Sequence, residues 1–401
     1  MNNTPQLRFP GFTGEWSEKP FGEIYKKNNV KNDGSIGVDK IISVANMYFK
    51  TDAAVGDAEY LKSYNVFRLG DIAYEGNKSA NHAYGRFVEN TIGEGIVSHV
   101  FDVYSPIAPN HCLLYWKYAI NYERIMRPIL EKSTIKSTMM TNLIAKDFLK
   151  QKTLVPSPAE QQKIAECLSA LDDLISAQGE KVDALKTRKK GLMQQLFPQN
   201  GETTPRLRFP GFTGEWSEKT FGSLLQENRD CSTKENEDTL LTSSIEGMFL
   251  NSEVFSHQRG SSTIGYRKIK KGMLILSAQN LHLGNANVNL RFESGLVSPA
   301  YKTYDVIGCL PQYMYHWVKQ DSTKQFFLNA TTQGASGCRQ NVVWEQLYKQ
   351  IIYLPSPAEQ QKIASCLSAL DDLIASESAE LEALKAHKKG LMQQLFPEPA
   401  K

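Results

Sequence analysis

The chain repeats itself, and this repeat limits the possible folds more than any other feature. Residues 7–19 recur without change at 207–219, an offset of 200. A longer block, 156–198, recurs at 355–397 with 32 of its 43 positions identical. A solenoid would repeat every 20–50 residues, so a period near 200 indicates two equivalent domains instead. The chain of 401 residues is therefore predicted to be a tandem duplication.

The segments between the repeated blocks have diverged almost completely. They cover about 20–154 and 220–353, and a short match of 95–98 with 295–298 is one of the few landmarks left. A duplication without any functional constraint would diverge uniformly along its length. Two nearly fixed frames around two different inserts instead predict a common scaffold that carries two variable domains.

Each long block is predicted to form one long helix. Ser157, Pro158 and Glu160 occupy the N-cap, N1 and N3 positions of a capping box, which recurs at 356–359. Pro198 and Pro397 are expected to end the helices. Apolar residues follow a heptad pattern at Ile164, Leu168, Leu171, Ile175, Val182, Leu185, Leu192 and Leu196, and again at Ile363, Leu367, Leu370, Ile374, Leu381, Leu384, Leu391 and Leu395.

Two such apolar stripes in one chain most simply bury each other. We therefore expect an antiparallel intramolecular coiled coil, with a homodimeric coiled coil as the alternative. Gln178 and Lys189 fill the polar gaps of the first series, and Glu377 and Lys388 those of the second. Gly191 and Gly390 lower helix propensity. A close approach to a helix or a partner would explain them, and a merely tolerated glycine is the alternative.

The inserts are predicted to be mixed α/β domains, so the fold class is α+β. Strands are expected within 34–49, 69–74, 272–278 and 295–304, and helices within 112–129 and 310–327. The predicted organisation is a repeat segment (1–19), a first variable domain (20–154), a first long helix (155–198), a second repeat segment (199–219), a second variable domain (220–353) and a second long helix (354–397).

Composition and motifs argue against several functional classes. Six dispersed cysteines form neither a CxxC pair nor a zinc-like cluster, which is typical of reduced cytoplasmic thiols. No apolar run is long enough for a membrane span, and no secretory signal is recognisable. Histidine motifs of metalloenzymes and nucleotide-binding glycine loops are also missing. We therefore expect a cytoplasmic protein that carries no cofactor, no metal and no catalytic residues.

Local charge favours nucleic acid, although the net charge is only +3. The run 254–292 contains no Asp or Glu, and both inserts end in an acid-free polar stretch. Cations and hydroxyls contact phosphates, whereas Arg, Asn and Gln can read base edges. An ordinary solvated surface is the alternative for each cluster. The candidate DNA-binding residues are Lys78, Asn81, Tyr84, Arg86, Lys132, Lys136, Arg259, Ser261, Thr263, Tyr266, Arg267, Lys268, Gln333, Arg339, Gln340 and Asn341.

Three repeated motifs resemble those of one protein family. They are Arg-Phe-Pro-Gly-Phe at Arg8, Pro-x-x-x-Glu-Gln-Gln-Lys-Ile at Pro156, and Lys-Lys-Gly-Leu-Met-Gln-Gln-Leu-Phe at Lys189, each with its second copy. This set resembles the specificity subunit of type I restriction–modification systems along the whole chain.

The resemblance implies a non-catalytic subunit whose two target-recognition domains each read one half of a split asymmetric site in double-stranded DNA. The helices would set the gap and dock two modification (methyltransferase) subunits, and restriction subunits would join through the assembled complex. S-adenosylmethionine, ATP and Mg would then bind only to partner subunits. The alternatives are a coiled-coil scaffold that joins two ligand-binding domains without a DNA role, and a methyltransferase or nuclease that acts alone.

Overall fold

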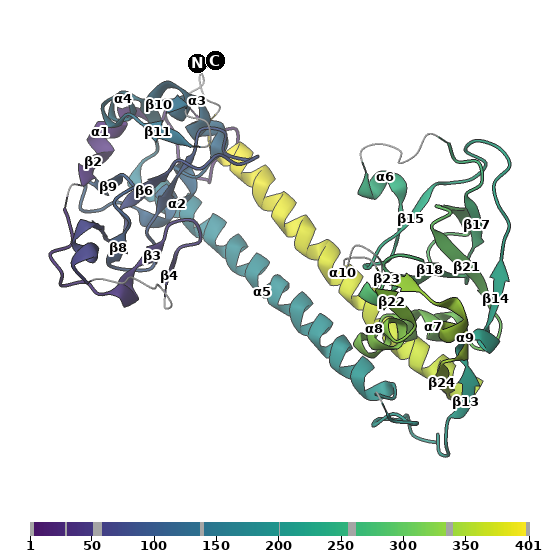
Figure 1. Ribbon diagram of the computed structural model, residues 1–401. Coiled ribbons are helices and arrows are strands. Elements are labelled where there is room, and N and C mark those ends of the chain that lie inside the picture. The colour runs from purple at the N-terminus through teal and green to yellow at the C-terminus, as the bar shows by residue number, and fades with distance from the viewer. Residues whose placement is uncertain are drawn as a thin grey trace. The chain divides into compact units, whose positions relative to one another are not determined.

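The computed structural model describes residues 4–28, 30–50, 58–136, 140–199, 201–255, 262–333 and 340–397. These residues form two compact units (Figure 1). Unit 1 contains residues 1–178 and 380–401, and unit 2 contains residues 179–379. Each unit therefore holds one variable insert, the first part of that insert's own long helix, and the last part of the long helix from the other repeat.

Unit 1 is built on a four-stranded antiparallel sheet of order β2-β9-β6-β7. These strands are β2 (Tyr25–Asn28), β9 (Val103–Pro106), β6 (Ile72–Glu75) and β7 (Arg86–Glu89). Four two-stranded sheets pair β1 (Ser17–Pro20) with β12 (Lys152–Val155), β3 (Ile42–Ser43) with β4 (Tyr48–Phe49), β5 (Asn65–Phe67) with β8 (Gly95–Val97), and β10 (Thr134–Lys136) with β11 (Thr141–Leu143). The shorter helices are α1 (Phe21–Ile24), α2 (Leu113–Ala119), α3 (Glu123–Ser133) and α4 (Ala145–Lys150).

Unit 2 repeats this topology with a different sequence. Its four-stranded sheet has the order β14 (Leu225–Asn228), β21 (Tyr301–Val306), β18 (Leu274–Ser277) and β19 (Ala286–Val288). Its strand pairs are β13 (Ser217–Thr220) with β24 (Ile351–Leu354), β15 (Leu241–Ser243) with β16 (Met248–Leu250), β17 (Arg267–Lys270) with β20 (Ser294–Val297), and β22 (Thr331–Gln333) with β23 (Gln340–Val342). Its shorter helices are α6 (Asn251–Val254), α7 (Pro311–Val318), α8 (Asp321–Leu328) and α9 (Trp344–Lys349).

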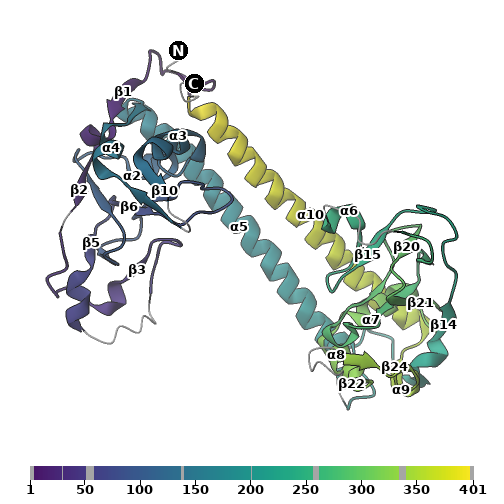
Figure 2. The ribbon, with the colours of Figure 1, turned by 45° about the horizontal axis from the view of Figure 1, so that its top comes forward.

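The long helices α5 (Pro158–Leu196) and α10 (Pro357–Leu395) each span 39 residues, as the capping and heptad patterns predict (Figure 1 and Figure 2). The hydroxyl of Ser157 accepts the amide of Glu160 at 3.3 Å, which is one half of the predicted capping box. The other half is wrong, because the Glu160 carboxylate accepts two hydrogen bonds from the Arg8 guanidinium, at 2.8 and 2.7 Å.

The two helices pair in an antiparallel direction, and the polar gap residues mark the register. In unit 1, Lys388 of α10 contacts Asp172 of α5 at 2.5 Å. In unit 2, Lys189 of α5 contacts Asp371 of α10 at the same distance. The heptad residues between these pairs are buried or half-buried, so the predicted intramolecular coiled coil is confirmed.

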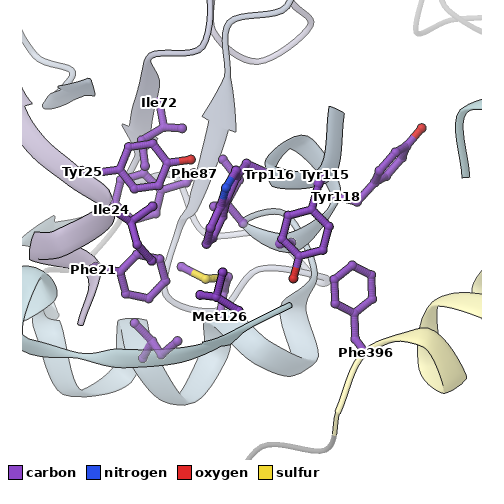
Figure 3. Packing of buried hydrophobic residues seen from close by; sticks show 14 of the residues in the cluster. Phe21, Ile24, Tyr25, Ile72, Phe87, Tyr115, Trp116, Tyr118, Met126 and Phe396 are labelled. Carbon is purple, nitrogen blue, oxygen red and sulfur yellow. The ribbon is translucent and has the colours of Figure 1, made fainter. Parts of the chain in front are cut away.

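The end of each long helix completes the core of the unit built from the other repeat. Leu395 and Phe396, which end α10, are each 1% exposed in the core of unit 1. Figure 3 shows Phe396 next to Tyr115 of α2, and their ring centroids lie 5.8 Å apart. Leu196 and Phe197, which end α5, occupy the same place in the core of unit 2. Each unit therefore needs residues from both repeats to exclude water from its core.

The short repeated block fastens both helices to its unit. In unit 1, Arg8 binds Glu160 at the start of α5, and the Leu7 amide donates to the Gln394 carbonyl at the end of α10 at 3.0 Å. Trp16 packs edge-on against Phe396. Unit 2 repeats these contacts through Arg208–Glu359, Leu207–Gln195 and Trp216. These contacts explain why the buried residues of the block are identical in both copies.

Several element boundaries differ from the sequence prediction. The helix expected at 112–129 divides into α2 and α3 around Asn121, a residue type that favours turns over helix interiors. The helix expected at 310–327 likewise divides into α7 and α8, because Gln320 is extended. The strand expected at 295–304 is β20 and β21, separated by a turn in which the Tyr301 amide donates to the Ser298 carbonyl.

Two further expectations are corrected. Most of 34–49 is not strand, because the Asn32 side chain accepts the amides of Gly34 and Ile36 and holds a turn there. Close helix packing does not explain Gly191 and Gly390. Apart from the glycine's own turn of helix, no described atom lies within 4 Å of the position that a Cβ would take at either glycine.

We predict that Phe396→Ala destabilises unit 1 and Phe197→Ala destabilises unit 2, each by about 3–5 kcal/mol, because each change leaves a cavity in an aromatic core. Hydrogen exchange read peptide by peptide at increasing urea gives the free energy of unfolding for each unit separately. Leu174→Ala is the control, because that side chain is 55% exposed and its loss should change stability by less than about 0.5 kcal/mol. Equal effects of all three changes would contradict this account.

Candidate nucleic-acid interface

The acid-free stretch that ends each insert forms the same element in both units, a two-stranded antiparallel ribbon. In unit 1, β10 pairs with β11, and Lys136 lies opposite Thr141. In unit 2, β22 pairs with β23, and Gln333 lies opposite Gln340. The ribbon tips, 137–139 and 334–339, lie outside the described residues, and with them Arg339. A two-stranded ribbon is one of the elements that fit the major groove of DNA.

In unit 1, the structure brings the two predicted clusters together. The loop 76–85 joins β6 to β7 and carries Lys78 and Asn81, both exposed. Its first residue, Gly76, accepts hydrogen bonds at its carbonyl from the amide and hydroxyl of Thr141, at 2.8 and 3.1 Å. Asn77 forms an isolated bridge with Met140 at the end of the ribbon. Loop and ribbon are therefore joined to each other at this end of the ribbon.

Buried hydroxyls support this surface from below. The Tyr74 hydroxyl donates to the Tyr84 carbonyl at 2.7 Å and contacts the Thr141 hydroxyl at 2.5 Å. Burial raises the pKa of Tyr74, so its hydroxyl stays protonated. The Tyr84 hydroxyl donates to Glu131 of α3 at 2.6 Å, and Tyr84 is only 8% exposed. Its place in the structure is that of a support for the loop.

The remaining unit 1 candidates differ in how their charge is matched. Arg86 forms an ion pair with Glu75 at 2.7 Å and also donates to the Ala45 carbonyl. Lys132 is exposed at the end of α3, and no carboxylate of the described residues lies within ion-pair distance of it. Lys136 is on β10, where the structure describes its backbone only. Lys132 therefore offers the least compensated charge beside the ribbon.

In unit 2, the run 254–292 contains no acidic residue, but the fold places carboxylates from outside the run against it. Glu237, from outside the run, contacts Lys268 at 2.5 Å, and this bond lowers the pKa of the Glu237 carboxyl to about 2. Glu235 accepts the amide and hydroxyl of Thr263, which is fully buried. Much of the positive charge that the sequence suggested is neutralised locally.

The unit 2 candidates also fall in two places. Arg267 and Lys268 lie on β17, and Thr263 and Tyr266 precede it, whereas Gln340 and Asn341 lie on the ribbon. Asn341 is exposed, and Gln340 accepts the Thr331 hydroxyl at 2.8 Å. Gln333 ends β22, with only its backbone described, and Arg259 and Ser261 fall outside the described residues. The main contacts of β17 are with β20 and β21, whereas in unit 1 the loop and the ribbon are bridged directly by Asn77 and Met140.

The loop of unit 2 that corresponds to 76–85 is not among the candidates predicted from the sequence. It runs from Ala278 to Asn285 and joins β18 to β19, as 76–85 joins β6 to β7. It contains Gln279 and Asn280 but no lysine or arginine, so a search for positive charge could not find it. The matching strand order of the two sheets is the signal that reveals it.

Among the described residues, no group of three or more histidine, cysteine, aspartate and glutamate side chains is arranged to hold a metal ion. None of the described helices is long and apolar enough to cross a membrane.

Comparison with known families agrees with this geometry. A model described as the type I restriction modification DNA specificity domain matches residues 14–187 and, a second time, residues 223–386. The chain belongs to this family. It carries two type I specificity domains in tandem, and each match covers one variable insert with most of its long helix. The family supplies DNA specificity and is not a catalytic one.

Solved type I structures share the fold. The S subunit of a type I restriction–modification system from M. genitalium aligns with a TM-score of 0.54 and 14% identity, over 99% of this chain and 100% of that one. A chain from a study of complex assembly and conformational transition in the type I R-M system aligns with a TM-score of 0.54 and 14% sequence identity, over 98% of both chains. No curated protein matches the sequence.

We predict that Lys132→Ala and Lys136→Ala each make the slope of log affinity against log salt less negative by about 0.9, the change for one lost phosphate contact. Duplex DNA binding of the assembled complex over a series of salt concentrations measures this slope. Lys268→Ala serves as a matched control, because Glu237 already neutralises that lysine, and it should change the slope less. An unchanged slope for both Lys132→Ala and Lys136→Ala would place the ribbon of unit 1 away from the DNA backbone.

Proposed function

We propose that this chain is the DNA-reading subunit of a type I restriction–modification complex, and that each unit reads one half of a split, asymmetric site in double-stranded DNA. The observation that carries the proposal is the contrast between the two units. Their frames are nearly identical, whereas their ribbons and their β6–β7 or β18–β19 loops present different side chains.

The chemistry of these elements suits DNA. The loop of unit 1 presents Lys78 and Asn81, and Lys132 lies at the end of α3 just before the ribbon; these side chains can bind phosphates and base edges. The ribbon of unit 2 presents Asn341 beside the hydrogen-bonded pair of Thr331 and Gln340. Because the two sets differ, the two half-sites should differ, and the complete site should be asymmetric.

The repeated frame supports docking of two modification subunits. In unit 1, Phe9, Pro10 and Phe12 line a hollow of about 480 Å³ together with Lys163, Glu166 and Cys167 of α5. All of these except Glu166 recur in the second repeat, as Phe209, Pro210, Phe212, Lys362 and Cys366. The recurrence of these residues around the start of both long helices suggests the same partner at both copies. S-adenosylmethionine, ATP and Mg would bind to partner subunits, with restriction subunits joining the assembled complex.

The long helices would act as the spacer between the half-sites. At 1.5 Å per residue, a helix of 39 residues is about 58 Å long. Almost all differences between the two helices fall within 176–188, whereas the ends that enter the cores are identical in both copies. The ends are thus constrained by both frames, which leaves helix length as the variable that sets the unread gap.

The two units should specify DNA independently. Replacing residues 220–353 with the corresponding insert of another family member should change the second half-site and leave the first unchanged, because the frame and both helix ends are retained. Methylation-site mapping of the complex formed with the modification subunit measures both halves at once.

Two results would contradict the proposal. Methylation at a site altered in both halves would show that the units do not read independently. A wild-type complex without any sequence preference would favour a scaffold that joins two ligand-binding domains.

A further inference from the structure

A hollow of about 500 Å³ opens in unit 2 between strand β15, with the turn that follows it, and the loop 278–285. Its lining combines hydroxyl and amide side chains, among them Ser243, Ser277, Asn280 and Asn285, with apolar side chains such as Leu240 and Val254. The described residues that line it include no lysine or arginine, and its only charged group, Glu246, accepts the Ser244 hydroxyl. The hollow is therefore unsuited to phosphate and suited to an uncharged ligand that offers several hydrogen bonds.

Strand register shows that a charged pair fills the same place in unit 1. Glu75 lies opposite Arg86 on β6 and β7, and Ser277 lies opposite Asn285 at the corresponding step of β18 and β19. The Arg86 guanidinium donates to the Ala45 carbonyl at 2.9 Å. In unit 2 the equivalent carbonyl, that of Ser244, accepts the Asn287 amide at 2.7 Å. Because the corresponding side chains of unit 2 are smaller and uncharged, the space that the Arg86 side chain fills in unit 1 stays open in unit 2.

Two amides lie at the rim of the hollow, free to bind a ligand. Gln279 and Asn280 are exposed, and neither side chain has a hydrogen-bond partner among the described residues. Their backbone is nevertheless held firmly. The backbone N–H of Asn280 donates to the Ser277 hydroxyl, and the backbone carbonyl of Asn280 accepts a hydrogen bond from the backbone N–H of Asn285. The backbone N–H of Ala278 donates to the Ala300 carbonyl, and all three distances are 3.2 Å. Ligand binding would therefore order two side chains on an already rigid loop.

The loop is placed next to the element that carries the ribbon. Residues Leu281–Leu283 form a short 3₁₀ helix that packs against α8, and α8 leads directly into β22. In unit 1, the loop 76–85 is attached to the corresponding helix α3 by the hydrogen bond from Tyr84 to Glu131, and α3 leads into β10. The hollow and its two amides thus belong to the same side of the fold as the ribbon.

We infer that this hollow, with Gln279 and Asn280 at its rim, is the base-reading site of unit 2 and takes the edge of an adenine in the second half-site. This inference rests on the proposed function. The side-chain amide of Asn or Gln pairs with adenine in bidentate fashion, donating to N7 and accepting from the N6 amino group. In unit 1, Lys78 takes the position of Asn280, and the Glu75–Arg86 pair fills the place of the hollow, so this unit would read a different base, as two different half-sites require.

The experiment uses the complete complex and a panel of duplexes in which each base pair of the mapped site is replaced in turn. Gln279→Ala or Asn280→Ala should reduce discrimination at one position of the second half-site by on the order of tenfold or more. Discrimination in the first half-site and the salt slope should stay unchanged. Gln226→Ala is the matched control, an exposed amide on β14 at the opposite edge of the same sheet.

Gln279→Glu and Asn280→Asp test the chemistry rather than the fold. A carboxylate accepts a hydrogen bond from the N4 amino group of cytosine, so these variants should move the preference at that position from adenine toward cytosine. Uniformly weaker binding of all duplexes would indicate a phosphate contact and overturn the inference. Wild-type discrimination in every variant would also overturn it while leaving the proposed function intact, whereas a wild-type complex without discrimination would refute the proposed function itself.

Discussion

Each unit's hydrophobic core is closed by a phenylalanine from the other repeat. Phe396, from the second repeat, completes the core of unit 1, and Phe197, from the first repeat, completes the core of unit 2. Phe396 packs against Trp16, Tyr115 and Tyr122, and Phe197 against Tyr313. Because each long helix starts in one core and ends in the other, the two helices must run antiparallel. The buried Arg8–Glu160 and Arg208–Glu359 pairs reinforce this arrangement, since losing one partner would leave an uncompensated buried carboxylate, at a cost of about 3–5 kcal/mol.

This interlocked frame separates stability from recognition. The aromatic cores and the repeated blocks hold the helices and the four-stranded sheets, whereas the ribbons and the loops after β6 and β18 are outside these cores. Side chains such as Asn81 or Asn280 can therefore change with little loss of folding free energy. The same argument explains why two inserts could diverge almost completely inside a frame that stayed nearly fixed.

Sequence reasoning predicted what depends on local or periodic signals. Repeats, helix caps and heptads were sufficient for the tandem duplication, both 39-residue helices and their intramolecular pairing. Contacts between residues distant in sequence were not predictable in this way. The sequence alone did not show that Glu237 neutralises Lys268, that Arg8 occupies the Glu160 carboxylate, or that the loop 278–285 matches the loop 76–85. Each of these depends on a strand register or on packing that only the folded chain defines.

The most direct test of the interlocked frame is the light-scattering mass of the fragment 1–199. This fragment lacks Leu395 and Phe396 but ends in the same Gly-Leu-Met-Gln-Gln-Leu-Phe sequence at Gly191. Two copies could therefore complete each other's cores through Leu196 and Phe197. The account predicts a folded dimer for the fragment alone, and a one-to-one complex when residues 201–401 are co-expressed with it. A stable, folded monomer of residues 1–199 would contradict the claim that each unit needs the helix end of the other repeat.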